Sequence, residues 1–260
     1  MAQSNDDLYL GAAPTQVQGV DTGLNNPSVS PNTISPPNGG LGVGPMGRVF
    51  VYDIVPLTLQ VNNIAASQTP SGAGAVTLTA GTGVTSSSVL PFAYGTATLV
   101  LDVPRNIAYV SGSNISNRTF TASGWDIYGQ PMTETTTGPN ATTVFGAKAF
   151  KYLSGITISG AAAGAITIGT GDSFGLPYRL LTVNHIINVK WAAALATDAG
   201  TMTLADATSP ATATTGDVRG TYLPSSASNG TRRLTVSMFL PGIASGPNAT
   251  RVGALGVTQA

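Results

Sequence analysis

The chain has 260 residues, with eleven acidic and eleven basic side chains, one histidine and no cysteine. Charged residues make up 8% of the sequence, against roughly 25% in an ordinary soluble domain. The missing cysteine excludes disulfide bonds and thiolate metal sites. Scarce and scattered basic residues argue against a nucleic-acid partner. The absence of any run of about 20 apolar residues argues against a membrane partner.

The near-neutral composition favours association between subunits. Net charge keeps proteins apart, and this chain has a formal net charge of zero and few charges of either sign. A monomer kept soluble by its hydroxyl and amide groups is the alternative. We expect a homo-oligomer whose neutral surface is buried between subunits.

Residues 1–45 differ from the rest of the chain. Proline punctuates a sequence rich in Asn, Ser, Gly and Gln, and neither a helical nor a strand period appears. The first residues lack the basic and apolar regions of a classical secretory signal. The segment is interpreted as a disordered tail or as an extended arm laid on a neighbouring subunit, and the expected assembly favours the arm. Residues 46–260 are expected to form a β-rich domain.

The first predicted strand lies in residues 47–61, where Val49 starts a short alternation that Pro56 interrupts. Proline removes a ladder donor, so this stretch predicts an edge strand or two strands that meet at a bend. From Thr98 to Trp191 one strand candidate follows another, with turns between them. These candidates are residues 98–103, 106–112, 119–137, 149–160 and 165–171.

The clearest alternation in the chain lies in residues 181–191. Apolar residues and His185 share one face, and polar residues dominate the other. Strict alternation predicts a strand with one face on a core. His185, the only histidine, is therefore expected to be a core residue rather than a catalytic base. The residues of the predicted inner face are Leu181, Val183, His185, Ile187, Val189 and Trp191.

Three more strand candidates follow, at residues 202–204, 218–223 and 234–240. Short strands separated by turns are typical of a sandwich or barrel. The predicted fold class is all-β, a β-sandwich or barrel-like antiparallel domain with an extended Pro-rich N-terminal arm. A division of residues 46–260 into two subdomains that meet near residues 180–200 is left open.

One short motif in the sequence is similar to the nucleophile motif of a class of serine hydrolases. Gly171-Asp172-Ser173-Phe174 superficially resembles the serine motif of the GDS-type lipases and esterases. Those enzymes carry the motif near the N-terminus and pair it with a late Asp-x-x-His, and this chain has no such partner. The motif is therefore interpreted as a turn.

A carboxylate pair is the other candidate for chemistry. Asp126 and Glu134 flank a predicted hairpin turn, and glycoside hydrolysis uses two carboxyl groups. A structural role is preferred, in which the two residues face each other or pair with Arg118 and Lys148. No catalytic, cofactor-binding or metal-binding residue is predicted, and no cofactor.

Several segments of the central block together carry a family resemblance. They are DVPRNI at 102–107, TFTASGWD at 119–126, YGQPMTET at 128–135, FGAKAF at 145–150, ITI at 156–158, IGTGD at 168–172 and GLP at 175–177. Over about residues 98–180 the chain resembles virion structural proteins of tailed bacteriophages, in particular the capsid cement (decoration) proteins. The long Pro-rich N-terminal segment departs from the smallest cement proteins and fits an arm that ties capsomers together.

This resemblance implies a non-enzymatic, β-rich subunit that is made in the host cytoplasm and assembled on the capsid surface of the virion. The implied partners are the major capsid protein and further copies of the chain, often as a trimer. Three alternatives remain: a head–tail connector or tail component, a fibre or other receptor- or glycan-binding protein, and a carbohydrate-active enzyme using Asp126 and Glu134.

Overall fold

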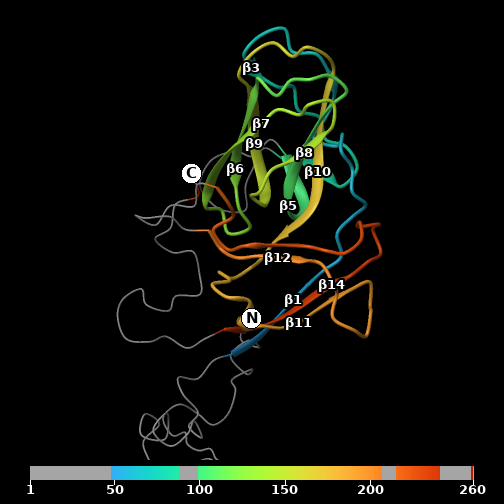
Figure 1. The fold of residues 1–260 in the computed structure, drawn as a ribbon, viewed down its shortest axis with the longest axis vertical. Helices are drawn as coiled ribbons and strands as arrows, with labels where there is room; N and C mark the ends of the chain where they lie inside the picture. The colour runs from blue at the N-terminus through green and yellow to red at the C-terminus, as the bar shows by residue number, and fades with distance from the viewer. Residues whose placement is uncertain (1–47, 88–98, 207–214, 241–258, 260) are drawn as a thin grey trace, which may run out of the picture. The chain divides into compact units, whose positions relative to one another are not determined.

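The computed structural model describes residues 48–87, 99–206, 215–240 and 259 (Figure 1). The arm predicted at residues 1–45 lies outside this part of the chain. Throughout the described residues the fold is all-β, which confirms the predicted fold class. The only helical element in this part is the 3-10 turn η3 (Val183–His185). Nothing helical there is long and apolar enough to cross a membrane.

The chain divides into two compact units. Among the described residues, the small unit contains 48–53, 182–189 and 235–240, and the large unit contains the rest. The small unit holds most of a three-stranded sheet with the order β1–β14–β11. Its strands are β1 (Arg48–Ile54), β14 (Leu234–Leu240) and β11 (Ile186–Trp191). β1 lies at the edge and ends before Pro56, so the predicted edge strand is confirmed.

The large unit is built on an eleven-stranded sheet that curls into a half-barrel. Its main path is β12–β13–β10–β5–β9–β6–β7, while β2 pairs with β10, β3 with β9, and both β4 and β8 with β5. The longest strands of the path are β5 (Leu99–Ser111), β6 (Thr119–Trp125), β7 (Pro131–Thr137), β9 (Phe150–Ile158) and β10 (Ile166–Gly175). The short ones are β2 (Ala65–Gln68), β3 (Gly74–Ala75), β4 (Val84–Ser86), β8 (Thr143–Phe145), β12 (Thr201–Thr203) and β13 (Thr221–Leu223).

The hydrophobic core of the large unit comes from the inward faces of its long strands. Tyr109 of β5 stacks on Phe120 of β6, with ring centroids 4.8 Å apart. Leu153 of β9 and Ile168 of β10 are fully buried in the same cluster. Each such side chain contributes roughly 1.5–3 kcal/mol relative to an exposed one. The core therefore follows directly from the alternation in the sequence.

β5 joins two segments that the sequence presents as separate strands. Pro104 interrupts the pattern between residues 98–103 and 106–112, yet the structure has one continuous strand. The pairing of β5 with β9 shifts register between Val100 and Arg105, and its pairing with β10 also shifts near Arg105. A proline is tolerated in a central strand where the ladder is irregular. The irregularity leaves Arg105 fully buried at the centre of the sheet.

The strand predicted over residues 181–191 is wrong in its first half. β11 covers only Ile186–Trp191, and the preceding residues form η3. The Thr182 hydroxyl accepts a hydrogen bond from the Asn184 N–H, a local bond that competes with extended pairing. Val183 is 55% exposed and His185 is not buried. The predicted core position of His185 is therefore also wrong.

The predicted hairpin is confirmed. β6 and β7 pair in register from Thr119↔Thr137 to Trp125↔Pro131. The Asp126 carboxylate accepts hydrogen bonds from the N–H groups of Tyr128 and Gln130, which closes the turn.

Candidate functional site

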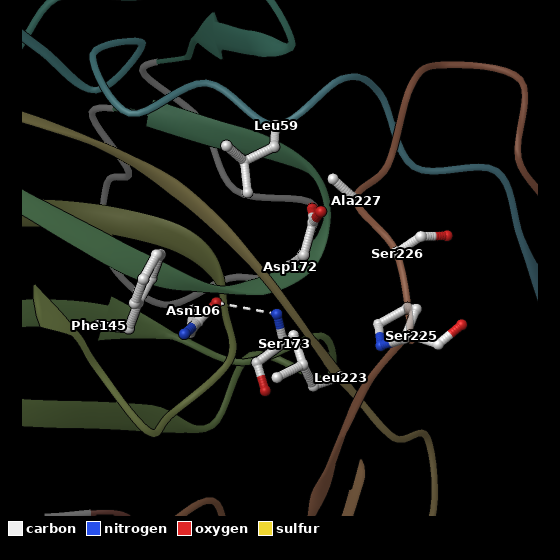
Figure 2. Close-up of a pocket in the computed structure, with 10 residues that line it drawn as sticks. Leu59, Asn106, Phe145, Asp172, Ser173, Leu223, Ser225, Ser226 and Ala227 are labelled. Carbon is white, nitrogen blue, oxygen red and sulfur yellow. Dashed lines mark hydrogen bonds between the residues drawn. The ribbon is translucent and has the colours of Figure 1, made fainter. Parts of the chain in front are cut away.

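A cavity of about 360 Å³ opens on the large unit beside β5 and β10 (Figure 2). Phe145 and Leu59 lie on one side of it, and the segment that follows β13 lies on the other. That segment is residues 224–227, and Leu223, the last residue of β13, lies just before it. Asn106, Asp172 and Ser173 complete the lining.

A buried arginine lies behind the cavity. Arg105 is 1% exposed and donates from Nε to the carbonyl oxygen of Gly171 at 2.8 Å. Its Nη1 lies 3.1 and 3.0 Å from the two carboxylate oxygens of Asp102, and its Nη2 lies 2.6 Å from Asp172 Oδ1. The guanidinium also lies over the ring of Phe174, 5.3 Å from its centroid. The positive charge is thus neutralised on two sides within the protein.

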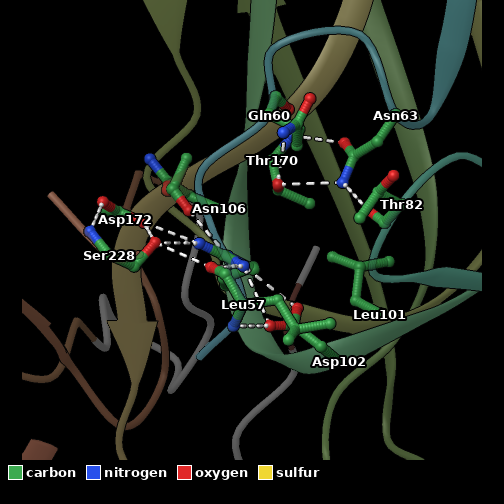
Figure 3. Close-up of polar contacts among 12 residues, drawn as sticks. Leu57, Gln60, Asn63, Thr82, Leu101, Asp102, Asn106, Thr170, Asp172 and Ser228 are labelled. Carbon is green, nitrogen blue, oxygen red and sulfur yellow. Dashed lines mark hydrogen bonds and ion pairs between the residues drawn. The ribbon is translucent and has the colours of Figure 1, made fainter. Parts of the chain in front are cut away.

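Ser228 ties this arginine to a distant part of the chain. Its N–H donates to Asp172 Oδ2 at 2.7 Å, and its hydroxyl lies 2.7 Å from Asp172 Oδ1 and 2.8 Å from the Leu57 carbonyl oxygen (Figure 3). Arg105 Nη1 reaches the same carbonyl at 3.3 Å. Asp102, Arg105, Asp172 and Ser228 are hereafter the Arg105 cluster. This cluster connects strands β5 and β10 to the loops at residues 57 and 228.

The predicted turn at Gly171–Phe174 is wrong. These residues lie in β10, where the pairing with β5 is irregular between Thr170 and Phe174. Asp172 is an acceptor for Arg105, and the Ser173 hydroxyl lies 3.3 Å from that of Thr221. Glycine and aspartate favoured a turn in the sequence, but the buried ion pair holds the segment extended. The resemblance to a lipase serine motif ends there, because the hydrogen-bond partners of Ser173 are Asn106 and Thr221 rather than a histidine.

The polar atoms that line the cavity are largely engaged inside the protein. Asn106 accepts from the Ser173 N–H at 3.0 Å and donates to the Gly146 carbonyl oxygen at 2.8 Å. Both oxygens of Asp172 belong to the Arg105 cluster. The cavity therefore offers apolar walls and little unpaired charge.

A second set of ionisable groups gathers around the β6–β7 hairpin and is hereafter the hairpin cluster. Its members are Asp126, Glu134, Lys148, Asp217 and Arg219, each no more than 8% exposed. Arg219 forms an ion pair with Asp126 and lies over the ring of Tyr128, 4.9 Å from its centroid. Asp217 accepts from the N–H groups of Ala149 and Arg219.

The expected pairing of the two carboxylates is thus partly correct. Asp126 forms an ion pair, but its partner is Arg219 rather than Arg118, which instead donates to the carbonyl oxygen of Ala161. Glu134 Oε1 accepts from the N–H of Lys148 at 2.9 Å and from that of Ala147. Both carboxylates are engaged in internal bonds, as the structural interpretation requires.

Burial shifts the pKa values of three members of the hairpin cluster, Glu134, Asp217 and Lys148. Burial raises the pKa of Glu134, although the two backbone N–H donors and the charge of Lys148 oppose it. Burial also raises the pKa of Asp217, and it lowers the pKa of Lys148 against the attraction of Glu134 and Asp217. Glu134 Oε2 is buried without a hydrogen-bond partner. The carboxylate charge of Glu134 is therefore held at a cost in stability.

Glu134→Gln is expected to leave the free energy of unfolding at about pH 8 unchanged or raise it by about 1 kcal/mol. The amide oxygen keeps both backbone hydrogen bonds, and the buried charge disappears. Because the raised pKa makes the folded protein bind more protons than the unfolded chain, stability falls as pH rises between the two pKa values. The variant should flatten that fall. Urea unfolding at a series of pH values tests this, and a loss above about 2 kcal/mol at pH 8 contradicts it.

Gln259 supplies a contact that no sequence signal indicated. It forms a parallel bridge with Met132 of β7, and its carbonyl oxygen accepts from the Thr133 N–H at 3.0 Å. Its side-chain oxygen accepts from the buried Val218 N–H at 3.0 Å. Gln259 is 3% exposed. The residue thereby joins the edge of β7 to the loop of the hairpin cluster.

Gln259→Ala is expected to lower the free energy of unfolding by about 1–3 kcal/mol, because the Val218 N–H loses its acceptor while buried. The amide proton of Val218 should also exchange faster with solvent. Gln130→Ala, in the exposed hairpin turn, is the matched control and should cost less than about 0.5 kcal/mol. Equal losses in the two variants would contradict the role given to Gln259.

The described residues offer no metal centre. No group of three or more His, Cys, Asp or Glu side chains able to hold a metal ion occurs among them. His185 lies in the small unit, whereas Asp126, Glu134, Asp172 and Ser173 belong to the large unit. Searches of protein-family models, curated proteins and solved structures find no match to the chain.

Proposed function

We propose that the protein is a non-enzymatic structural protein of a tailed-phage virion, which binds the major capsid protein and stabilises the shell as an oligomeric cement protein. The supporting observation is how the chain uses its few charges. The Arg105 and hairpin clusters engage nine ionisable or polar residues in internal bonds, whereas large apolar side chains remain exposed. Such a surface suits contact with other subunits.

For its size, the small unit exposes more large apolar side chains than the large unit does. Val51 of β1, Val183 of η3 and Ile187 of β11 are 47%, 55% and 54% exposed. A monomer gains nothing from three branched side chains in water, whereas burial between subunits stabilises an assembly by about 25 cal/mol per Å² of apolar surface. Among the residues that the structure describes, the other exposed large hydrophobic side chains are Val55, Leu57, Tyr128, Phe145, Leu181, Leu195, Leu204 and Leu223.

The engaged carboxylates also support a role without catalysis. Asp126 and Glu134 are 2% and 8% exposed and serve as acceptors for groups of the same chain. A glycosidase requires two carboxyl groups that reach the substrate. The hairpin carboxylates are thus better suited to holding the fold than to hydrolysis.

Copy number in purified virions of the phage that carries this chain tests the proposal. Quantitative mass spectrometry should find it in numbers comparable with the major capsid chains. A number that fits one ring would favour a connector, and one that fits a few fibres would favour a receptor-binding protein. Absence from virions would overturn the proposal and reopen the enzyme alternative.

Deletion of residues 1–45 tests the proposed arm. We expect the remaining chain to fold, with an unchanged circular dichroism spectrum, and to lose its ability to protect capsids against heat or chelator treatment. The full-length chain is the control in the same assay. Equal protection by both forms would contradict the arm.

A further inference from the structure

We propose that the cavity beside β10 is a binding site for an uncharged two-ring aromatic group. The inference goes beyond the virion role and does not depend on it. All the residues that line the cavity belong to the large unit.

The size of the cavity points to a guest of this kind. Its volume of about 360 Å³ lies within the range of roughly 300–1,000 Å³ that is usual for small-molecule sites. A cavity of about 150 Å³ is sufficient for benzene. Roughly twice that volume accommodates two fused rings, as in indole or naphthol.

The walls of the cavity offer an aromatic surface. Phe145 is 49% exposed although it belongs to a strand, and Leu223, just before the facing segment, is 45% exposed (Figure 2). An aromatic guest can stack offset or edge-on against Phe145, and its burial removes both apolar side chains from water. Leu59 and Pro224 extend the apolar lining.

The polar groups of the lining already have partners within the protein, which argues against a charged ligand or a sugar. The Asp172 charge is matched by Arg105 at 2.6 Å, so the cavity gives no attraction for a free cation. Both polar ends of the Asn106 side chain are bonded within the protein. A saccharide needs several hydrogen bonds at once, and hydroxyls left unpaired on burial are costly.

The hydroxyls of Ser225 and Ser226 point away from Phe145 and Leu59 and bond to residues that do not line the cavity (Figure 2). Ser226 Oγ accepts from Trp191 Nε1 at 3.1 Å, and Ser225 Oγ donates to Asp198. These two serines therefore offer the guest no polar contact.

The indole N–H of Trp191 provides a spectroscopic signal for binding in the cavity. It is 3% exposed, and its N–H contacts a residue of the lining. The only other tryptophan, Trp125, lies at the end of β6 and does not line the cavity. In a ¹⁵N–¹H spectrum the Trp191 indole signal should move on binding, whereas the Trp125 signal should stay in place.

Titration of the full-length chain with 5-fluoroindole tests the site, followed by ¹⁹F and ¹⁵N–¹H NMR. We expect a saturable shift of the Trp191 signal, assigned with Trp125→Phe. Ala227→Leu should abolish binding because the added side chain fills the cavity. Phe145→Ala should weaken binding roughly tenfold, and Phe145→Leu less, because leucine retains apolar contact but no ring. Leu195→Ala, at a 93% exposed position outside the lining, should bind like the wild type.

The same titration distinguishes an aromatic side chain of a partner protein from a free aromatic compound. If both N-acetyltryptophanamide and fluoroindole bind, the natural guest is a tryptophan side chain of a partner protein. If only fluoroindole binds, the natural guest is a free aromatic compound. Either result supports an aromatic site. Three results would overturn the aromatic site. They are the absence of a saturable shift with either probe, binding that persists in Ala227→Leu, and a Trp191 shift caused by monosaccharides but by neither probe. Circular dichroism of each variant verifies that it is folded.

Discussion

Arg105→Leu is expected to lower the free energy of unfolding by about 3–5 kcal/mol, the largest loss predicted for a single side chain. The substitution leaves Asp102 and Asp172 beside an apolar group, with their charges uncompensated and largely buried. It also removes the donors to the carbonyl oxygens of Gly171 and Leu57. Urea unfolding followed by circular dichroism measures the loss.

Arg118→Leu is the matched control for this substitution. Arg118 also bonds to a carbonyl oxygen, but it does so near the surface, so the same replacement should cost less than about 1 kcal/mol. Arg105→Lys should be intermediate, because lysine retains the charge and loses the forked donors. In a double-mutant cycle, Asp172→Asn should reduce the cost of Arg105→Leu. A loss below about 1 kcal/mol for Arg105→Leu would mean that desolvation already cancels the attraction within the cluster.

Gly124→Ala is expected to destabilise the protein by about 3 kcal/mol, through a collision between backbones. A Cβ at Gly124 of β6 would lie 2.0 Å from the Tyr152 carbonyl oxygen and 3.0 Å from the Leu153 Cα atom of β9. Neither atom belongs to a flexible side chain, so relief requires the two strands to move apart. The register between β6 and β9 shifts at this residue, where the chains approach closely.

Gly155→Ala in the neighbouring strand is the matched control. An added Cβ there has nothing within 4 Å, and the backbone is not in the left-handed region. The unfolded chain loses freedom on this substitution, so the free energy of unfolding should stay constant or rise by up to about 1 kcal/mol. Denaturant unfolding of the two variants side by side provides the comparison. Similar effects of the two alanines would contradict the close approach at Gly124.

The buried charges show where sequence reasoning stopped short. In a chain with so few charges, an arginine inside the apolar run LVLDVPRNIAYV signals a buried partner, but the sequence does not say which acid supplies it. Asp172 lies 67 positions away, within a stretch that looks like a turn. The burial of Glu134 can be inferred more directly, because the alternation of β7 places it with Met132 on the inward face. Its contact with the Lys148 N–H still required the fold.

The alternating and turn-bounded segments determined by themselves that this protein is all-β, and they located the β6–β7 hairpin and strand β14. Those features depend on local periodicity and turn chemistry, which the sequence carries directly. Tertiary structure decided what depends on contacts between distant residues. It joined β5 through Pro104 and paired Arg105 with Asp172, whereas η3 depends on the local bond between Thr182 and Asn184. It also formed the cavity from residues between 59 and 227, because sheet register is set by the whole curled sheet rather than by any one strand.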